Sequence, residues 1–454
     1  MSKLTSIQGP AVQRRIYSRA EHSISRQDIS RNTLKVLYDL NAAGFQSFLV
    51  GGGVRDLLLG LSPKDFDIAT DAEPEQVRRI FQNSRIIGRR FRIVHVHFGR
   101  EIIEVSTFRA QAAQSTEIRG HSSNRQVSHL DSAHSQAGMI LRDNVFGTIE
   151  EDALRRDFTV NALYYTVQNF EVHDFTQGME DINQRVLRII GDPVQRYRED
   201  PVRILRAVRL ASKLNFNIEQ ETAAAIQPNA HLLQSVPPAR LFDEFMKLFF
   251  NGSGTVTFRQ LLSFDVFQVL FPSITAYLAE KQDLLMLEGA FESTDKRISE
   301  AKSVTPAFLL AAILWPAVRR QYHHYLGADV PPLPAMHRAS EDIIREQLDI
   351  IAIPKRFSIP MREIWEYQIR LEHRSGRRAF SLLEHKRFRA AYDFVLLREA
   401  SGEPLAGLGT WWTDFQAADA QGRKTMQEQL LKNRISKSRK RRVKSKRTAK
   451  RISQ

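Results

Sequence analysis

The sequence predicts an α+β chain, in which a small mixed sheet near the N-terminus is followed by an all-α remainder. Strand-like segments are concentrated between residues 45 and 108. After residue 167 the apolar spacing is almost wholly helical, apart from short extended pieces near 170–175 and 186–190. The length of 454 residues allows two to four domains, and no internal repeat is visible.

Composition excludes several classes of protein. With 42% hydrophobic and 26% charged residues, the chain has an ordinary globular composition. No apolar run reaches 18 residues, so we expect no membrane span, and the polar, basic first twenty residues do not form a secretory signal. The absence of cysteine excludes disulfides, iron–sulfur clusters and cysteine-ligated zinc. We therefore expect a cytoplasmic protein.

The positive charge is concentrated at the C-terminus. The net charge is +15, and residues 432–451 contain twelve Lys or Arg and no acid, which leaves +3 on the rest. Such a tail either solubilises or targets the chain, or contacts nucleic-acid phosphates. Composition alone favours neither reading.

Each expected element has a local signal. Ser30 is a candidate N-cap, Pro74 suits a first helical turn, and Gly99 suits a hairpin turn. Residues 1–29 are polar and are expected to be flexible. The expected elements are helices at 31–44, 54–60 and 74–81 and strands at 45–50, 66–70, 91–99 and 101–108.

Residues 110–143 are rich in Ser, Gln, His and Arg and show little periodicity, so we expect a flexible loop. Its histidines, His121, His129 and His134, lack a spacing typical of metal ligands.

The clearest chemical signal is the segment "LVGGGVRDLLLGLSPKDFDIAT". A glycine run between a strand and a helix leaves backbone N–H groups free to face phosphate oxygens. Asp65 and Asp67 follow at a strand start and point to the same side. Paired carboxylates repel each other unless a divalent cation bridges them. A glycine turn or an aspartate pair alone would be weak evidence, but together they indicate a metal and phosphate site.

A third carboxylate is expected from a neighbouring strand. Glu104 is the best candidate. Glu101 is three residues away, so its side chain points to the opposite face of the strand, and we expect it at the solvent-facing strand start. Three carboxylates could hold two Mg²⁺ ions, one activating an attacking hydroxyl and the other stabilising a leaving pyrophosphate.

These motifs resemble class II of the polymerase-β-type nucleotidyltransferases, which holds bacterial poly(A) polymerases and tRNA CCA-adding enzymes. The resemblance covers most of residues 25–400. The combination of these motifs in this order is specific to the family, although each motif alone is not. The matching strings are "GGGVRDLLLG", "KDFDIAT", "RRDFTVNALYY", "DFTQGMEDI" and "EDPVRILRAVRLASKLNF".

The resemblance implies residue roles. Asp65, Asp67 and Glu104 would be the catalytic and Mg²⁺-binding carboxylates. The residues implied to hold the triphosphate are Gly52, Gly53 and Arg55. Those implied to line the nucleotide pocket are Arg155, Arg156, Asp157 and Asn161, and those implied to read the base are Asp200, Arg203 and Arg206.

Helix geometry is consistent with the base-reading set. Asp200 is placed as an N-cap with Pro201 at the first helical position, and Arg203 and Arg206 share one side of the helix. A carboxylate and a guanidinium can hydrogen-bond a base edge. The alternative, ordinary helix-surface charge, stays open for Arg206 and Arg209.

Three features favour the poly(A) branch over the CCA-adding branch. "RIIGRRFRIVHVHFG" and "RDNVFGTIEEDALRRDFTVNALYY" look like the bacterial poly(A) polymerase versions of these segments. Residues 353–365 and 382–399 resemble its C-terminal helical region. The basic tail suits RNA gripped through its phosphates. We therefore expect a template-independent enzyme that adds AMP from ATP to RNA 3′ ends in RNA polyadenylation and turnover, with tRNA CCA addition as the alternative.

The expected partners are ATP and single-stranded RNA 3′ ends with little sequence preference. Basic residues interleave with Phe388 and Tyr392, which we expect in the core, as we do the Trp411–Trp412 pair. The candidate RNA contacts are Lys386, Arg387, Arg389, Arg439, Lys440, Arg441 and Arg442. The expected domains are 1–29, the head 30–185, the neck 186–250, the body 251–415 and the tail 416–454.

Two other classes fit less well. A non-catalytic RNA-binding protein would gain nothing from clustered carboxylates beside RNA. An attached phosphohydrolase would need several separated His and Asp ligands, but the sequence offers only the dipeptide His173–Asp174.

Overall fold

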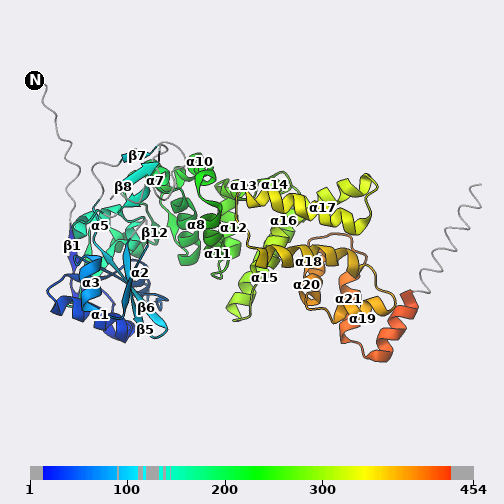
Figure 1. Ribbon diagram of the computed structural model, residues 1–454, viewed down its shortest axis with the longest axis horizontal. Helices are drawn as coiled ribbons and strands as arrows, with labels where there is room; N and C mark the ends of the chain where they lie inside the picture. The colour runs from blue at the N-terminus through cyan, green and yellow to red at the C-terminus, as the bar shows by residue number, and fades with distance from the viewer. Residues whose placement is uncertain are drawn as a thin grey trace, which may run out of the picture. The chain divides into compact units, whose positions relative to one another are not determined.

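The computed structural model describes residues 14–88, 92–110, 116–118, 132–135, 140–143 and 145–430. The chain divides into two compact units between Ser235 and Val236. Most strands lie in the blue to teal part of the chain and helices predominate after it, which confirms the α+β class (Figure 1). The division falls inside the expected neck, and the five-part domain scheme stays a prediction.

The first unit is built around an eight-stranded sheet of order β1-β11-β10-β2-β3-β6-β5-β4. Strands β3 and β6 are parallel, whereas the other neighbours are antiparallel, so the sheet is mixed as predicted. The strands are β1 (Arg15–Tyr17), β2 (Ser47–Val50), β3 (Asp67–Thr70), β4 (Ser84–Ile87), β5 (Ile93–Phe98), β6 (Glu101–Thr107), β10 (Leu163–Thr166) and β11 (Glu171–Asp174).

Helices cover this sheet and extend the unit toward Ser235. Ser30 caps α1 as predicted, since its Oγ accepts from the backbone N–H of Thr33 at 3.1 Å. The helices are α1 (Arg31–Ala42), α2 (Gly52–Leu58), α3 (Pro74–Ile80), α5 (Ile149–Arg155), α6 (Gly178–Gln184), α7 (Pro193–Glu199), α8 (Val202–Leu214), α9 (Gln220–Ala224) and α10 (Ile226–Asn229). The 3₁₀ turns are η1 (Arg19–Glu21), η2 (Arg26–Asp28), η3 (Thr159–Asn161) and η4 (Ala230–Ser235), and β12 (Val186–Leu187) pairs in parallel with β13 (Asn217–Ile218).

One sheet face forms a core that supports the candidate site. Phe48, Val50 and Ala69 lie on this face, and Tyr164 of β10 packs edge-on to Phe48. Helix α5 adds Ile149 and other side chains to the cluster. Since Val50 is also the register partner of Asp67, this core ends directly at a candidate catalytic carboxylate.

The structure differs from three sequence-based expectations in the first unit. Strand β1, within the segment expected to be polar and flexible, pairs with β11 and forms one edge of the sheet. Glu101 begins β6 as predicted but is only partly exposed, because it accepts hydrogen bonds from Ser30 and Asn32 at the start of α1. The expected loop contains a three-stranded sheet of β7 (Thr116–Ile118), β8 (Ser132–Ser135) and β9 (Ile140–Asp143).

Strands β7, β8 and β9 were not predicted because of their amino-acid composition. Segments such as "SAHS" carry little apolar alternation, so only backbone pairing marks them as strands. His134 lies in β8, whereas His121 and His129 lie outside the described residues.

The second unit is helical throughout its described part. Trp365 of α18 donates from Nε1 to the carbonyl of Ala311 in α16 at 3.1 Å, which fixes two long helices against each other. The helices are α11 (Pro238–Phe249), α12 (Gly254–Ser263), α13 (Val266–Leu270), α14 (Pro272–Thr275), α15 (Lys281–Ser299), α16 (Pro306–Gly327), α17 (Pro332–Leu348), α18 (Lys355–Leu371), α19 (Arg377–Leu383), α20 (Phe388–Ala400) and α21 (Leu408–Ala417).

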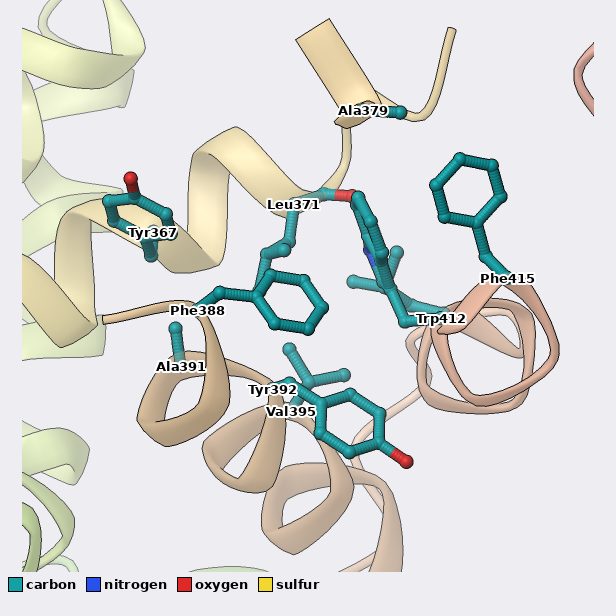
Figure 2. Close-up of a cluster of buried hydrophobic side chains, with 10 residues drawn as sticks. Tyr367, Leu371, Ala379, Phe388, Ala391, Tyr392, Val395, Trp412 and Phe415 are labelled. Carbon is teal, nitrogen blue, oxygen red and sulfur yellow. The ribbon is translucent and has the colours of Figure 1, made fainter. Parts of the chain in front are cut away.

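A second core joins α18, α19, α20 and α21 (Figure 2). Phe388 and Trp412 pack edge to face with centroids 5.2 Å apart, and Trp412 Nε1 donates to the carbonyl of Leu371 at 3.0 Å. Tyr392 is also buried. The structure confirms these aromatic side chains as core residues rather than stacking platforms for RNA.

Candidate active site

Two candidate carboxylates are neighbours across adjacent strands. Asp67 in β3 is the register partner of Glu104 in β6, so their side chains share one face of the sheet. On the far side, Glu104 is paired with His95 of β5, whose Nε2 lies 3.2 Å from Glu104 Oε1. Asp65 lies two residues before β3 and is exposed. The structure thus brings Asp67 and Glu104 together as predicted.

The electrostatics of Asp67 reflect this crowding. Burial raises the pKa of Asp67, and the negative charges of Glu104 and Asp65 raise it further, whereas Arg156 lowers it, with a result of about 6. A half-buried carboxylate near two others is a group whose repulsion a divalent cation would relieve, and carboxylate oxygens are the ligands that Mg²⁺ prefers. The carboxylates of Asp65, Asp67 and Glu104 are therefore suitable ligands for Mg²⁺. In the described part of the chain, however, no three His, Asp or Glu side chains already converge as a metal site.

The glycine turn lies against the carboxylate pair. Gly51 has φ of 71°, a conformation that L-residues avoid, and a Cβ there would lie 3.8 Å from Asp67 Oδ2 and 3.7 Å from Arg156 Nη1. Gly52 begins α2 with the Arg55 guanidinium against it, where a Cβ would lie 3.3 Å from Nη2. The backbone of Gly53 packs beside Asp65. The backbone of the turn therefore lies beside Asp65 and Asp67 and also beside Arg55 and Arg156.

Arg156 is held by a buried network. Its Nε donates to the Tyr164 hydroxyl at 2.8 Å and its Nη2 to Asp152 at 2.9 Å, while the same hydroxyl donates to Asp152 at 2.7 Å. Arg155 also donates to Asp152, at 3.1 Å. Burial opposes ionisation of Asp152, but the two arginines outweigh it and lower its pKa to about 2. Asp152 thus fixes Arg156 with Nη1 beside Gly51.

A second network connects α2 with α8. Arg55 is buried, and it donates from Nε to Asp56 at 2.9 Å and from Nη1 to Asn161 at 2.7 Å. Asn161 donates to Asp157 at 3.2 Å, and Arg206 donates from Nε to Asp157 at 2.7 Å. Burial would raise the pKa of Asp157, but Arg206 and the hydrogen bonds lower it to about 2. Four predicted nucleotide-site residues therefore contact one another in series.

The start of α8 differs from the prediction. The helix begins at Val202 with Pro201 as N-cap, so Asp200 is not the N-cap and instead ends α7. The reason is that the Arg203 and Ile204 amides bond three residues back, to Asp200 and Pro201, in a tight first turn.

Arg203 is an internal residue. It is buried and donates to Glu199 at 2.9 Å and to the carbonyl of Arg196 at 2.8 Å. Arg196 in turn donates to the carbonyls of Arg155 and Arg156. Arg196 therefore connects Arg203 to the segment that carries Arg155 and Arg156.

Sequence reasoning missed Asp152, Tyr164, Arg196 and Glu199. The acid at 152 was detectable, because it lies three and four residues before the two pocket arginines on one helix. Arg196 and Glu199 are likewise spaced for an ion pair. Arg196 also donates to backbone carbonyls more than 35 residues away in sequence, and no sequence pattern predicts this contact.

Two of the three predicted RNA contacts in the described part of the second unit have partners within the chain. Arg387 donates to Glu363 at 2.5 Å and Arg389 to Asp393 at 3.1 Å. Lys386 is exposed. The four tail residues Arg439, Lys440, Arg441 and Arg442 lie outside the described residues.

Three family models match the chain. Residues 47–188 match the poly A polymerase head domain, residues 215–278 the probable RNA and SrmB-binding site of polymerase A, and residues 328–447 the polymerase A arginine-rich C-terminus. The head match contains Asp65, Asp67 and Glu104 together with the glycine turn. The chain is also 48% identical over 421 residues to poly(A) polymerase I of Salmonella typhi, which covers 91% of this chain and 88% of that protein.

The chain belongs to the poly(A) polymerase family. Poly(A) polymerase I of Haemophilus influenzae is 42% identical over 91% of this chain and 89% of its own. By contrast, the CCA-adding enzyme of Lactobacillus helveticus is 36% identical over only 49% of this chain and 50% of its own. This poly(A) polymerase family member is therefore a nucleotidyltransferase with an RNA-binding region, as the sequence predicted.

Solved structures agree with the fold. The CCA-adding enzyme of Bacillus stearothermophilus in complex with CTP has a TM-score of 0.52 at 25% identity, covering 89% of this poly(A) polymerase family member and 82% of that chain. The Thermotoga maritima CCA-adding enzyme complexed with tRNA has a TM-score of 0.53 at 18% identity and covers 92% and 85%. Among the described residues, no helix combines the length and apolarity that a membrane crossing requires.

Proposed function

We propose that the chain is a template-independent poly(A) polymerase that adds AMP from ATP to the 3′ ends of RNA. The observation that carries this proposal is the 48% identity to poly(A) polymerase I over nine-tenths of both chains. The pairing of Asp67 with Glu104 beside a glycine turn supports the chemistry. The cytoplasm, where ATP and RNA are made, is the proposed location, and RNA polyadenylation and turnover the proposed role.

The reaction forms one bond and breaks one. The RNA 3′ oxygen attacks the α-phosphorus of ATP, the bond from that phosphorus to the bridging oxygen breaks, and pyrophosphate leaves while the hydroxyl proton passes to solvent. Asp65, Asp67 and Glu104 would hold two Mg²⁺ ions. When bound, Mg²⁺ neutralises the developing phosphate charge and lowers the pKa of the attacking hydroxyl. These carboxylates thereby orient the α-phosphate toward the RNA end.

The glycine turn is proposed to receive the triphosphate through the backbone N–H groups of Gly52 and Gly53. Arg156 would add a charged donor at this turn, because Asp152 and Tyr164 fix its other nitrogens. Arg55 lies against Gly52 and would hold the turn in place rather than bind through a mobile guanidinium.

The nucleoside is proposed to bind between η3 and α8. Arg155, Asp157 and Asn161 would line the sugar side of this pocket. Asp200, Arg203 and Arg206 would shape the base side, and since no template is used, these protein groups must select adenine. The series of contacts from Arg55 to Arg206 supports this placement, because it links the phosphate end to the base end.

The test is extension of a 3′-hydroxyl RNA of generic sequence with Mg²⁺ and each nucleoside triphosphate separately. Long ladders with ATP alone are the expected result. Addition of a few nucleotides, with CTP used and only on tRNA-like ends, would instead establish a CCA-adding enzyme. No incorporation with any triphosphate, by a folded chain, would refute nucleotidyl transfer.

A further inference from the structure

A cavity of about 530 Å³ lies at the junction of α18, α19 and the turn before α20, in the second unit. This volume is within the range of small-ligand sites. The residues of this cavity that matter here are Tyr367, Arg370, His373, Arg377, Arg378 and His385. None of them is among the basic residues that the sequence singled out for RNA contact.

The cavity is strongly basic. Three arginines and two histidines line it, and no Asp or Glu does so among the described residues. Arg377 and Arg378 are exposed. Of the acids nearby, Glu363 accepts from Arg387 at 2.5 Å, whereas Glu366 accepts from the cavity's own Arg370 at 3.2 Å and also lies 2.9 Å from His337. The positive field of the two exposed arginines is therefore available to an anion.

One wall of the cavity is rigid and aromatic. Tyr367 is only 4% exposed and belongs to the core that joins α18 to α21 (Figure 2). The imidazole of His385 stacks on the Tyr367 ring with centroids 4.9 Å apart and planes at 28°. Ala379 of α19 is fully buried in the same core, which fastens the helix that carries Arg377 and Arg378.

The tautomer of His385 is set by the backbone. The N–H of Arg387 donates to His385 Nδ1 at 3.2 Å, so that nitrogen accepts and Nε2 carries the proton of the neutral ring. The His385 ring, supported by the buried Tyr367, therefore offers a planar surface and an N–H donor beside the arginines. Aromatic and guanidinium groups in this combination suit a nucleotide, with its flat base and its phosphate.

We propose that this cavity binds one nucleotide of single-stranded RNA, with its phosphate on Arg377 and Arg378 and its base against the imidazole of His385, which Tyr367 supports from behind. All the residues that line the cavity belong to the second unit, whereas the proposed catalytic carboxylates belong to the first, so the cavity shares no residue with the proposed ATP site. The cavity also lies outside residues 215–278, the segment that matches a probable RNA-binding region. The inference rests on the proposed function only in taking RNA as the substrate.

The test compares two full-length variants of equal charge. Arg377→Ala/Arg378→Ala removes the cavity arginines, and Arg338→Ala/Arg345→Ala removes two exposed arginines of α17 as the control. Binding of a fluorescent 20-nucleotide single-stranded RNA is measured by anisotropy across a salt series. AMP incorporation onto a trinucleotide primer, too short to fill a second site, is measured alongside.

We expect the Kd of the 20-mer to rise about tenfold in the cavity variant and to change little in the control. The salt slope should fall by about 1.4 in the cavity variant, since each lost contact to a single strand removes about 0.7. Primer incorporation should match the parent in both variants. If the parent fails to extend the primer but shows the binding difference, the proposed function fails and the cavity assignment stands.

Three results would overturn the assignment. Equal loss of RNA affinity in both variants would mean that general positive charge, not the cavity, holds the RNA. Unchanged binding in the cavity variant would remove the site altogether. Displacement of the 20-mer by an acidic peptide of 15 glutamates at lower concentration than unlabelled RNA, in the parent only, would make the cavity a docking site for an acidic protein.

Discussion

Arg206 donates from Nε to Asp157 Oδ2 at 2.7 Å, and this pair fastens helix α8 to the segment before η3. Asp157 is nearly buried, so the guanidinium supplies most of the compensation for its charge. Through Asn161 the same carboxylate is connected to Arg55, which lies under the glycine turn. The base and phosphate ends of the proposed ATP site therefore share one set of hydrogen bonds.

The first prediction concerns this pair. Asp157→Asn and Arg206→Gln should each raise the KM for ATP and lower stability by about 2 kcal/mol, because each leaves a partly buried polar partner unsatisfied. The double variant should lose less than the sum, with a coupling energy of about 1 kcal/mol or more. Far-ultraviolet circular dichroism during urea unfolding measures the loss. The four tryptophans all lie in the second unit, so their fluorescence transition serves as an internal reference.

The control for that cycle is the exposed pair Lys35 and Asp39 on α1, at 2.9 Å. Exposed pairs of this kind contribute about 0.5 kcal/mol or less. Additive effects at Asp157 and Arg206, no larger than at the control pair, would show that the two residues act independently.

The second prediction separates catalysis from stability at Asp67. Asp67→Asn should reduce AMP incorporation by at least about a thousandfold, since Mg²⁺ loses a charged ligand. RNA affinity should remain that of the parent. The melting temperature should stay equal or rise, because a half-buried carboxylate beside Glu104 and Asp65 is a source of repulsion. Asp39→Asn, an exposed change on α1, is the matched control. A parallel loss of RNA affinity would contradict the assigned role.

The third prediction is a pH dependence. The arginines hold the pKa of Asp152 at about 2 in the folded chain, below its ordinary value of about 3.9. A carboxylate with a lowered folded pKa contributes stability that is fully present above pH of about 4 and is lost as pH falls toward 2. The parent should therefore lose on the order of 2 kcal/mol more than Asp152→Asn over this range.

Thermal melts between pH 5 and pH 2.5, followed by circular dichroism, would measure the difference. The two melting temperatures should converge as the pH falls, because protonated Asp152 resembles asparagine in charge. Curves that stay parallel would show that Asp152 does not titrate in this range.

Much of the candidate site was predictable because its signals are local. Strand alternation placed Asp67 and Glu104 on compatible faces, and the parallel pairing of β3 with β6 then made them neighbours. The glycine run predicted a tight turn, and Gly51 adopts a left-handed φ of 71°. The sequence-based prediction agrees with the structure at positions where the residue spacing of a strand or the residue preference of a turn alone determines the conformation.

The unpredicted features depend on contacts distant in sequence. Arg55 and Arg203 were predicted to contact the triphosphate and the base, and the structure shows that both are buried and hydrogen-bonded to Asn161 and Glu199, respectively. Strand β1 forms because β11, which would otherwise be the edge of the sheet, offers it backbone groups for pairing, and no pattern in "RIY" predicts this. A single sequence shows which groups are available, whereas tertiary packing decides which of them contact one another.

The last prediction concerns the tail, which lies outside the described residues. Deleting residues 432–454 removes twelve basic side chains and no acid. If half of them contact phosphates, the slope of log affinity against log salt should fall by about 4, since each contact to a single strand contributes about 0.7. Incorporation onto a trinucleotide primer should continue at the parent rate, because the tail is distant in sequence from the carboxylates. A tail of the same length rich in Gly and Ser is the control for chain length. An unchanged salt slope after deletion would assign the tail to solubility or targeting instead of RNA binding.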